Sequence, residues 1–91
     1  MIVIDYKLGT NKERDIAERV VQWCIEHFKL ERYDIDINME ICKYKTYKCW
    51  GTCEEGDDSN SFNITIANDQ SIRDFVATIT HEMVHVKQYV T

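Results

Sequence analysis

Three residues near one end of the chain have the types and the spacing needed for metal chemistry. His81, Glu82 and His85 form a His-Glu-x-x-His pattern. On a helix, positions i and i+4 lie on one face about one turn apart, so both imidazoles could reach a single ion. Glu82 would stand beside them, where it could accept a proton from a water molecule activated by that ion. The pattern therefore predicts a zinc hydrolase with His81 and His85 as metal ligands and Glu82 as the catalytic base.

The residues around this pattern predict the helix that such chemistry requires. Ser71 followed by Asp74 resembles an N-terminal capping pair. His81 and His85 lie off the apolar stripe of this segment, so the alternative interpretation is two polar-face histidines on an ordinary amphipathic helix. The agreement between motif and helical context favours the metal site. The stripe recurs at three- and four-residue steps and comprises Ile72, Phe75, Val76, Ile79, Met83, Val86 and Val90.

Length and composition indicate one small domain over residues 1–91. The 91 residues are 44% hydrophobic, with three Gly and no Pro, and can build a modest core. No apolar run reaches membrane-spanning length, and the first residues lack the basic and long apolar regions of a signal peptide, so a cytoplasmic protein without membrane contact is expected. The net charge of −5 disfavours broad electrostatic binding to nucleic acid and favours polypeptide partners.

The preceding sequence predicts one further helix and a small sheet. Thr10 and Glu13 form a capping-box signature at the start of a helix from about Asn11 to Lys29. Alternating hydrophobicity predicts a half-buried strand from Tyr33 to Cys42. We expect it to form a hairpin with a second strand, from Lys43 to Cys53. Two other segments complete the prediction: Ser61 to Ala67 as a third strand, and Met1 to Tyr6 as a strand or extended arm.

The four cysteines are expected to be free thiols or metal ligands, since no secretory signal points to an oxidising compartment. Cys24 lies in a helical stripe and Cys42 ends an alternating strand, so both are interpreted as packing residues. Cys49 and Cys53 flank Trp50-Gly51-Thr52 and could present two thiolates to a metal. A zinc knuckle would need a second pair of ligands, and none is nearby.

Lysines alternate with aromatic residues along the second predicted strand. One interpretation is a platform of cations and stacking rings for nucleic acid. The other, which we favour, is an edge strand whose lysines discourage pairing with another sheet. The residues concerned are Lys43, Lys45 and Lys48 with Tyr44, Tyr47 and Trp50.

From Tyr33 to Val90 the chain resembles the SprT-like zincin metallopeptidases. The likeness rests on the order of elements, on Trp50-Gly51-Thr52-Cys53, and on the distance from this segment to the motif at residues 81–85. It implies an α+β, zincin-like fold in which an N-terminal helix packs on a sheet of about three to four strands and the motif helix follows. It also implies zinc ligands at His81 and His85 and a general base at Glu82.

The resemblance leaves the third metal ligand open. In that family it is a histidine downstream of the motif helix, and this sequence reaches Thr91 without one. The metzincin pattern is excluded, because it would need Gly in place of Gln88 and His in place of Thr91. Three explanations remain: the chain is a fragment, an upstream residue such as Cys53 or Cys49 closes the site, or the domain holds metal weakly and is inactive.

The expected function is hydrolysis of peptide bonds in extended or unfolded polypeptide. The substrate would add to an exposed strand, either residues 61–67 or the preceding lysine-rich one. Two alternatives stay open. One is a non-catalytic zinc-binding or protein-interaction module, and the other is a nucleic-acid-associated SprT-like protein.

Overall fold

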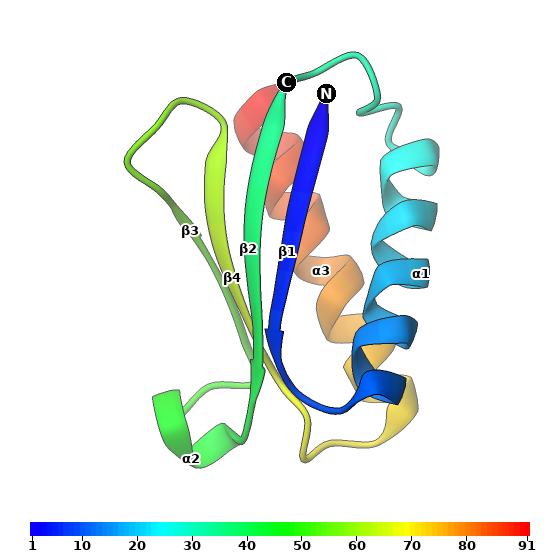
Figure 1. Cartoon of the computed structure of the whole chain (residues 1–91), viewed down its shortest axis with the longest axis vertical. Helices are drawn as coiled ribbons and strands as arrows, with labels where there is room; N and C mark the ends of the chain where they lie inside the picture. Colours follow the sequence, from blue (N-terminus) through cyan, green and yellow to red (C-terminus); the bar gives the residue numbers. More distant parts are fainter.

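A computed structural model describes all residues from Met1 to Thr91. The chain forms an α+β fold, as the sequence predicted, in which helices α1 and α3 lie on one face of a four-stranded sheet (Figure 1). The elements follow the order β1 (Ile2–Leu8), α1 (Asn11–His27), β2 (Ile35–Cys42), α2 (Tyr44–Tyr47), β3 (Gly51–Glu55), β4 (Ser61–Ala67) and α3 (Ile72–Val90).

The sheet is mixed, and its strand order is β1-β2-β4-β3. Strands β1, β2 and β4 are parallel, whereas β3 is antiparallel to β4. Every second residue of β2 is buried, from Ile35 to Ile41, and Phe62, Ile64 and Ile66 of β4 are buried beside them. The alternation therefore correctly predicted both central strands, since one face of each packs on the core.

The predicted hairpin between β2 and the following segment is wrong. Residues 44–47 form the short helix α2, and both edges of β2 are already paired with β1 and β4. The backbone N–H of Tyr44 donates to Asp69 Oδ1 at 2.8 Å, and Lys48 adopts a left-handed conformation with φ 60°. These interactions turn the chain before β3 begins. As a result β3 forms its hairpin with β4, and the three lysines lie before, in and after α2 rather than on an edge strand.

Helix α1 begins as predicted and ends two residues early. Thr10 and Glu13 make both hydrogen bonds of the capping box. At the other end Lys29 has φ 58°, and the N–H of Leu30 donates to the Ile25 carbonyl at 2.9 Å. This is the arrangement of a Schellman motif, in which the side chain after the left-handed residue packs back on the helix. The burial of Leu30 thus ends the helix at His27.

A tight left-handed turn connects β1 to α1. Leu8 and Gly9 have φ values of 62° and 70°. A Cβ atom on Gly9 would lie 3.0 Å from the Ile41 side chain, so both the conformation and the close approach require glycine there. The turn returns the chain over the sheet, and β1 is a true strand that runs to Leu8 rather than a loose arm.

A single hydrophobic core lies between the sheet and the two long helices. Cys24 is fully buried in it, as predicted, but Cys42 is half-buried and is not part of this core cluster. None of the three helices combines the length and the apolar composition that a membrane span requires.

Candidate metal site

Helix α3 holds the motif residues and packs on the sheet through the predicted stripe. The Ser71 side chain accepts a hydrogen bond from the N–H of Asp74 at 3.1 Å, which caps the helix. Phe75, Ile79, Met83 and Val86 are buried, whereas Ile72 in the first turn is exposed. Because these contacts fix the rotation of α3, they also fix the direction in which residues 81, 82 and 85 face.

His81 and His85 lie on one face of α3, as their spacing predicted. Their ring centroids are 4.8 Å apart and the ring planes are nearly perpendicular, at 89°. His81 is exposed and His85 is half-buried, with its Nδ1 3.3 Å from Gln88 Oε1. The third histidine, His27, stacks on Trp23 at the end of α1 and takes no part in this pair.

Glu82 is the one charged residue among the buried residues of the chain, with 5% of its surface exposed. It joins none of the three ion pairs of the fold, which link Met1 with Asp34, Lys7 with Asp5 and Arg19 with Asp15. Burial raises the pKa of Glu82, and the nearby His81 and His85 offset this rise only in part. A buried carboxylate without a fixed partner is costly for stability.

Gly51, the first residue of β3, lets the strand approach this carboxylate. A Cβ atom at this position would clash with Thr78 Cγ2 and would lie 3.0 Å from Glu82 Oε2. The glycine in the Trp50-Gly51-Thr52 segment is therefore the point of close approach between β3 and α3. The close approach of β3 thus contributes to the low exposure of Glu82.

An open groove of about 870 Å³ runs between the start of β3 and the exposed side of α3. Trp50 and Gly51 line it on the strand side, and Thr78, His81 and Glu82 line it on the helix side. The motif glutamate and one motif histidine thus face a concave surface, which is the usual setting for a catalytic or binding site.

A small polar network ties the two sides of the groove together, and sequence analysis did not identify it. Gln70 donates hydrogen bonds to the carbonyls of Ala67, at 2.7 Å, and Trp50, at 3.5 Å. Its Oε1 accepts a hydrogen bond from Thr78 Oγ1 at 3.2 Å. The one sequence signal for Thr78 is its position four residues before Glu82, on the same helix face.

Strand β3 has a free edge beside this groove. Trp50 O accepts from the Ala67 N–H, and the Gly56 N–H donates to Ser61 O, so the even-numbered residues bond to β4. In an antiparallel pair the residues between them direct their N–H and C=O groups away from the partner strand. Gly51, Cys53 and Glu55 therefore offer unpaired backbone groups at the edge. Strand β4, the other predicted substrate strand, is enclosed between β2 and β3 and has no free edge.

The donor set fits zinc in type but is incomplete in number. Imidazole nitrogen is a common zinc ligand, and two imidazoles lie side by side here. No group of three His, Cys, Asp or Glu side chains is placed to hold one metal ion. Cys49 and Cys53 therefore do not complete the site in this arrangement. A catalytic zinc site has three protein ligands. Two candidate ligands, the imidazoles of His81 and His85, lie together here.

Comparisons with protein-family models, curated proteins and solved structures found no match. The chemistry of the site therefore rests on the residues and geometry described above.

Cys53 is expected to react slowly with alkylating reagents. Burial, followed by the negative charges of Glu82, Glu54 and Glu55, raises its pKa to about 11. Since the thiolate is the reactive form, only about a thousandth of Cys53 would be ionised at a pH three units below that pKa. Mass spectrometry after brief iodoacetamide treatment at pH 8 should find Cys53 unmodified in the folded protein and modified in urea. Fast labelling of the folded protein would contradict this expectation.

Proposed function

We propose that this chain carries the active-site helix of a zinc-dependent metallopeptidase of the SprT-like type. The observation that supports this most strongly is the burial of unpaired Glu82 beside His81 and His85. A carboxylate in this position lowers stability, so a catalytic role explains its presence better than packing does. Its position one residue after the first histidine is the one that a water-activating base requires.

Each motif residue has a distinct role in this proposal. His81 and His85 would hold the ion weakly, because a catalytic zinc site usually has three protein ligands, so excess zinc is needed to fill the site. Bound zinc would supply Lewis-acid polarisation of the substrate carbonyl. Glu82 would accept a proton from the attacking water and pass it to the departing amine nitrogen. Burial favours this role, because a raised pKa gives the carboxylate a higher proton affinity than an exposed glutamate has.

The substrate would be an extended polypeptide segment paired with the edge of β3. The free backbone groups of Gly51, Cys53 and Glu55 could bind a peptide without regard to its sequence. Such a segment would pass the mouth of the groove that Glu82 and His81 line. A folded protein cannot offer its backbone in this way, so unfolded chains should be the better substrates.

Zinc binding and cleavage should both depend on His81. In a titration followed by NMR, zinc should shift the ring signals of His81 and His85 and leave those of His27 unchanged. With excess zinc, the chain should cleave an unfolded protein such as reduced, carboxymethylated lactalbumin, and EDTA should stop the reaction. His81→Ala should lose both properties, whereas the matched control His27→Ala should keep both. Cleavage that survives EDTA or the His81 substitution would exclude the proposal.

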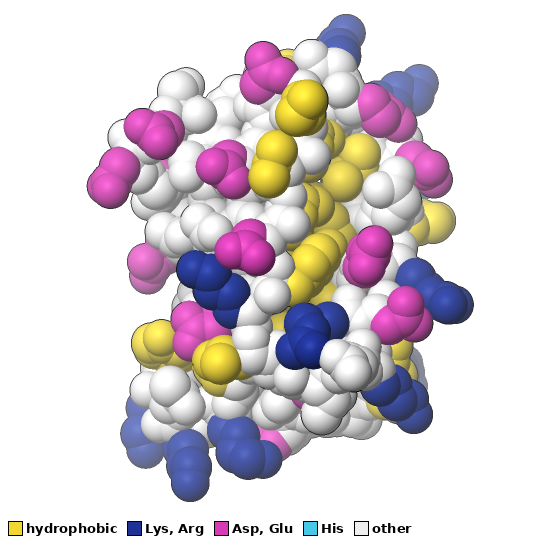
Figure 2. Space-filling view, viewed as in Figure 1, with side chains coloured by type: hydrophobic (Ala, Val, Ile, Leu, Met, Phe, Trp, Pro, Cys, Tyr) yellow, Lys and Arg dark blue, Asp and Glu magenta, His cyan; other side chains and the backbone are white.

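A second candidate function is binding of single-stranded nucleic acid near α2. The rings of Tyr44 and Trp50 lie against each other, with centroids 4.5 Å apart and ring planes tilted by 36°. The Trp50 and Tyr47 side chains are about half exposed. Exposed rings beside lysines are typical of surfaces on which bases stack. Lys43, Lys45 and Lys48 are all exposed here, and basic side chains gather at the α2 end of the molecule in Figure 2.

This second function predicts salt-sensitive affinity for an oligothymidine. Replacing the three lysines with alanine should weaken binding strongly at low salt and reduce its salt dependence. Replacing Lys12 and Arg19 of α1 together with Lys29, which follows the helix, provides a control with the same change in charge. Equal losses in both variants would show that only the overall charge matters.

A further inference from the structure

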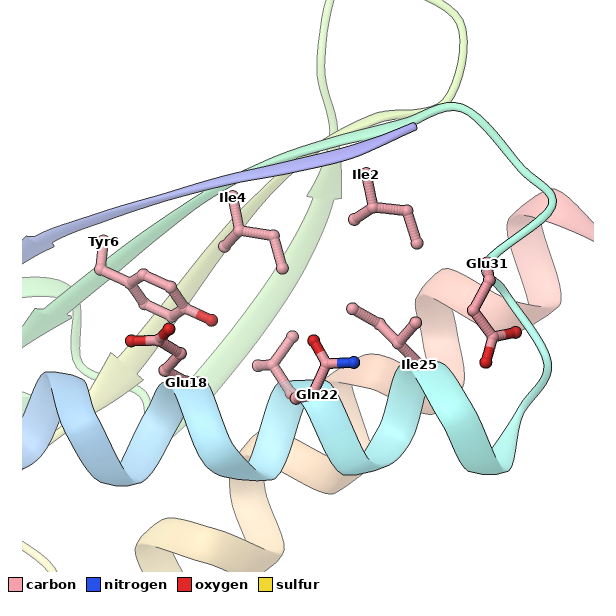
Figure 3. A pocket seen from close by; sticks show the side chains of 8 residues that line it. Ile2, Ile4, Tyr6, Glu18, Gln22, Ile25 and Glu31 are labelled. Atoms are coloured by element: carbon pink, nitrogen blue, oxygen red, sulfur yellow. The ribbon is translucent and has the colours of Figure 1, made fainter.

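A second groove lies on the opposite edge of the sheet, between β1 and α1. Its volume is about 350 Å³, and Ile2, Ile4, Val21 and Ile25 form its apolar floor. Figure 2 shows a hollow of hydrophobic side chains between strand and helix, with acidic side chains on both sides. In Figure 3, Ile2, Ile4 and Tyr6 point from β1 toward α1. No residue that lines this groove also lines the groove at the candidate metal site.

The backbone of β1 is also unpaired on this side. Met1 O accepts from the Ile35 N–H, which starts the parallel ladder with β2. In such a ladder alternate residues bond to the same neighbour, so the odd-numbered residues of β1 face β2. The N–H and C=O groups of Ile2, Ile4 and Tyr6 therefore point to the free edge. The same residues offer both backbone hydrogen bonds and an apolar floor.

The rim of the groove is acidic. Glu18 and Glu31 line it, no Lys or Arg does, and neither carboxylate belongs to an ion pair. Glu18 lies close enough to Tyr6 to contribute, after burial, to the raised pKa of the phenol. Two copies of this chain joined at β1 would bring four such carboxylates together in a protein of net charge −5. A second copy is therefore a poor occupant on electrostatic grounds.

We propose that the β1 edge and its groove bind an extended segment of another polypeptide that has apolar side chains at alternate positions and Lys or Arg at its ends. The segment would add as a fifth strand beside β1. Its alternate side chains would cover Ile2, Ile4 and Tyr6, and its basic ends would pair with Glu18 and Glu31. The site needs neither zinc nor Glu82, so it stands independently of the proposed peptidase activity.

A labelled peptide tests this proposal directly. The probe is fluorescein-tagged Lys-Val-Thr-Val-Thr-Val-Lys, measured by anisotropy at low salt with the metal-free protein in EDTA. The Glu18→Lys, Glu31→Lys double variant should bind it at least roughly tenfold more weakly. The control is Asp57→Lys, Asp58→Lys, which makes the same charge change in the exposed turn before β4 and should bind almost as well as the parent. NMR should show the amides of Ile2, Ile4 and Tyr6 shifting on binding.

Four results would overturn the proposal. The first is an equal loss of peptide affinity in both double variants. The second and third are an unchanged affinity of the parent protein for a peptide with glutamate ends, or for one with proline in place of the central valine. The fourth is a set of amide shifts confined to β3. Self-association of the parent chain through β1, seen by sedimentation at rising concentration, would assign the groove to a second copy instead.

Discussion

Glu82→Gln is expected to abolish peptide cleavage while making the metal-free protein more stable at neutral pH. Glutamine has nearly the same shape but cannot accept the proton, and losing a general base lowers turnover roughly a hundred- to ten-thousand-fold. The substitution also removes a buried negative charge that no basic side chain neutralises. We expect a gain of about 1 kcal/mol in the free energy of unfolding at pH 7.

The stability gain should depend on pH in a defined direction. Burial raises the pKa of Glu82 in the folded protein above its reference value of 4.5. A carboxyl group of this kind contributes stability that is fully present below pH 4.5 and is lost as pH rises through the folded-state pKa. The free energies of unfolding of the parent and of the glutamine variant should therefore be most similar in acid. The difference should grow as pH rises from 4.5 toward neutrality and then level off.

Urea unfolding in EDTA at several pH values measures this difference. Glu54→Gln, an exposed carboxylate of β3, provides a control with the same charge change and should alter stability by less than about 0.5 kcal/mol. A zinc titration completes the test, because the glutamine variant should still bind the ion through His81 and His85. If zinc binding and all activity survive the substitution, the site is a structural zinc site or the catalytic base is another residue.

Gly51→Ala is expected to have the second large effect, because it forces β3 away from α3. The added methyl group would overlap Thr78 Cγ2 and press on Glu82 Oε2 at 3.0 Å. Overpacking of this kind costs about 1–3 kcal/mol. It should also widen the groove and expose Glu82, so cleavage should fall although no ligand or base has been removed. Thermal unfolding and a cleavage assay on the same preparation measure both losses.

A second substitution can separate this clash from a general loss of the strand. Thr78→Ser removes Cγ2 and keeps the Oγ atom that donates to Gln70. The Gly51→Ala, Thr78→Ser double variant should therefore regain much of the lost stability, as a favourable coupling in a double-mutant cycle. Thr52→Ala, the neighbouring change on the other face of β3, should cost little. Absence of any rescue would mean that the backbone of residue 51, and not the contact with Thr78, decides the effect.

Features encoded by short-range interactions could be predicted from the sequence. The capping pairs Thr10 with Glu13 and Ser71 with Asp74 mark the starts of the two long helices, because each pair makes its hydrogen bonds within one turn. The alternation of Ile35 to Ile41 marks β2 for the same reason, since side-chain direction alternates along any strand. The side-by-side placement of His81 and His85 follows from helix geometry alone.

Features that depend on distant partners could not be predicted. Residues 43–48 are rich in Tyr, Thr and Lys and resemble a strand, but a hydrogen bond from Tyr44 to Asp69, 25 residues away, helps to hold them in a turn. Because residues 44–47 form a helix, β3 pairs with β4 and not with β2 as predicted. Likewise, nothing in the order of residues 81–85 shows that Glu82 is buried. Its burial depends on the approach of Gly51, which the pairing of β3 with β4 determines.

The left-handed residues at Leu8 and Lys29 bear on how this small protein could tolerate change. A side chain in that conformation costs roughly 1–2 kcal/mol relative to right-handed backbone, and glycine largely avoids this cost. Both positions lie outside the groove that contains Glu82. Glycine at these two turns should therefore raise the free energy of unfolding, whereas the burial of the Glu82 carboxylate lowers it. A laboratory evolution experiment could start from glycine at these two turns and afterwards accept mutations in the groove that the parent would not survive.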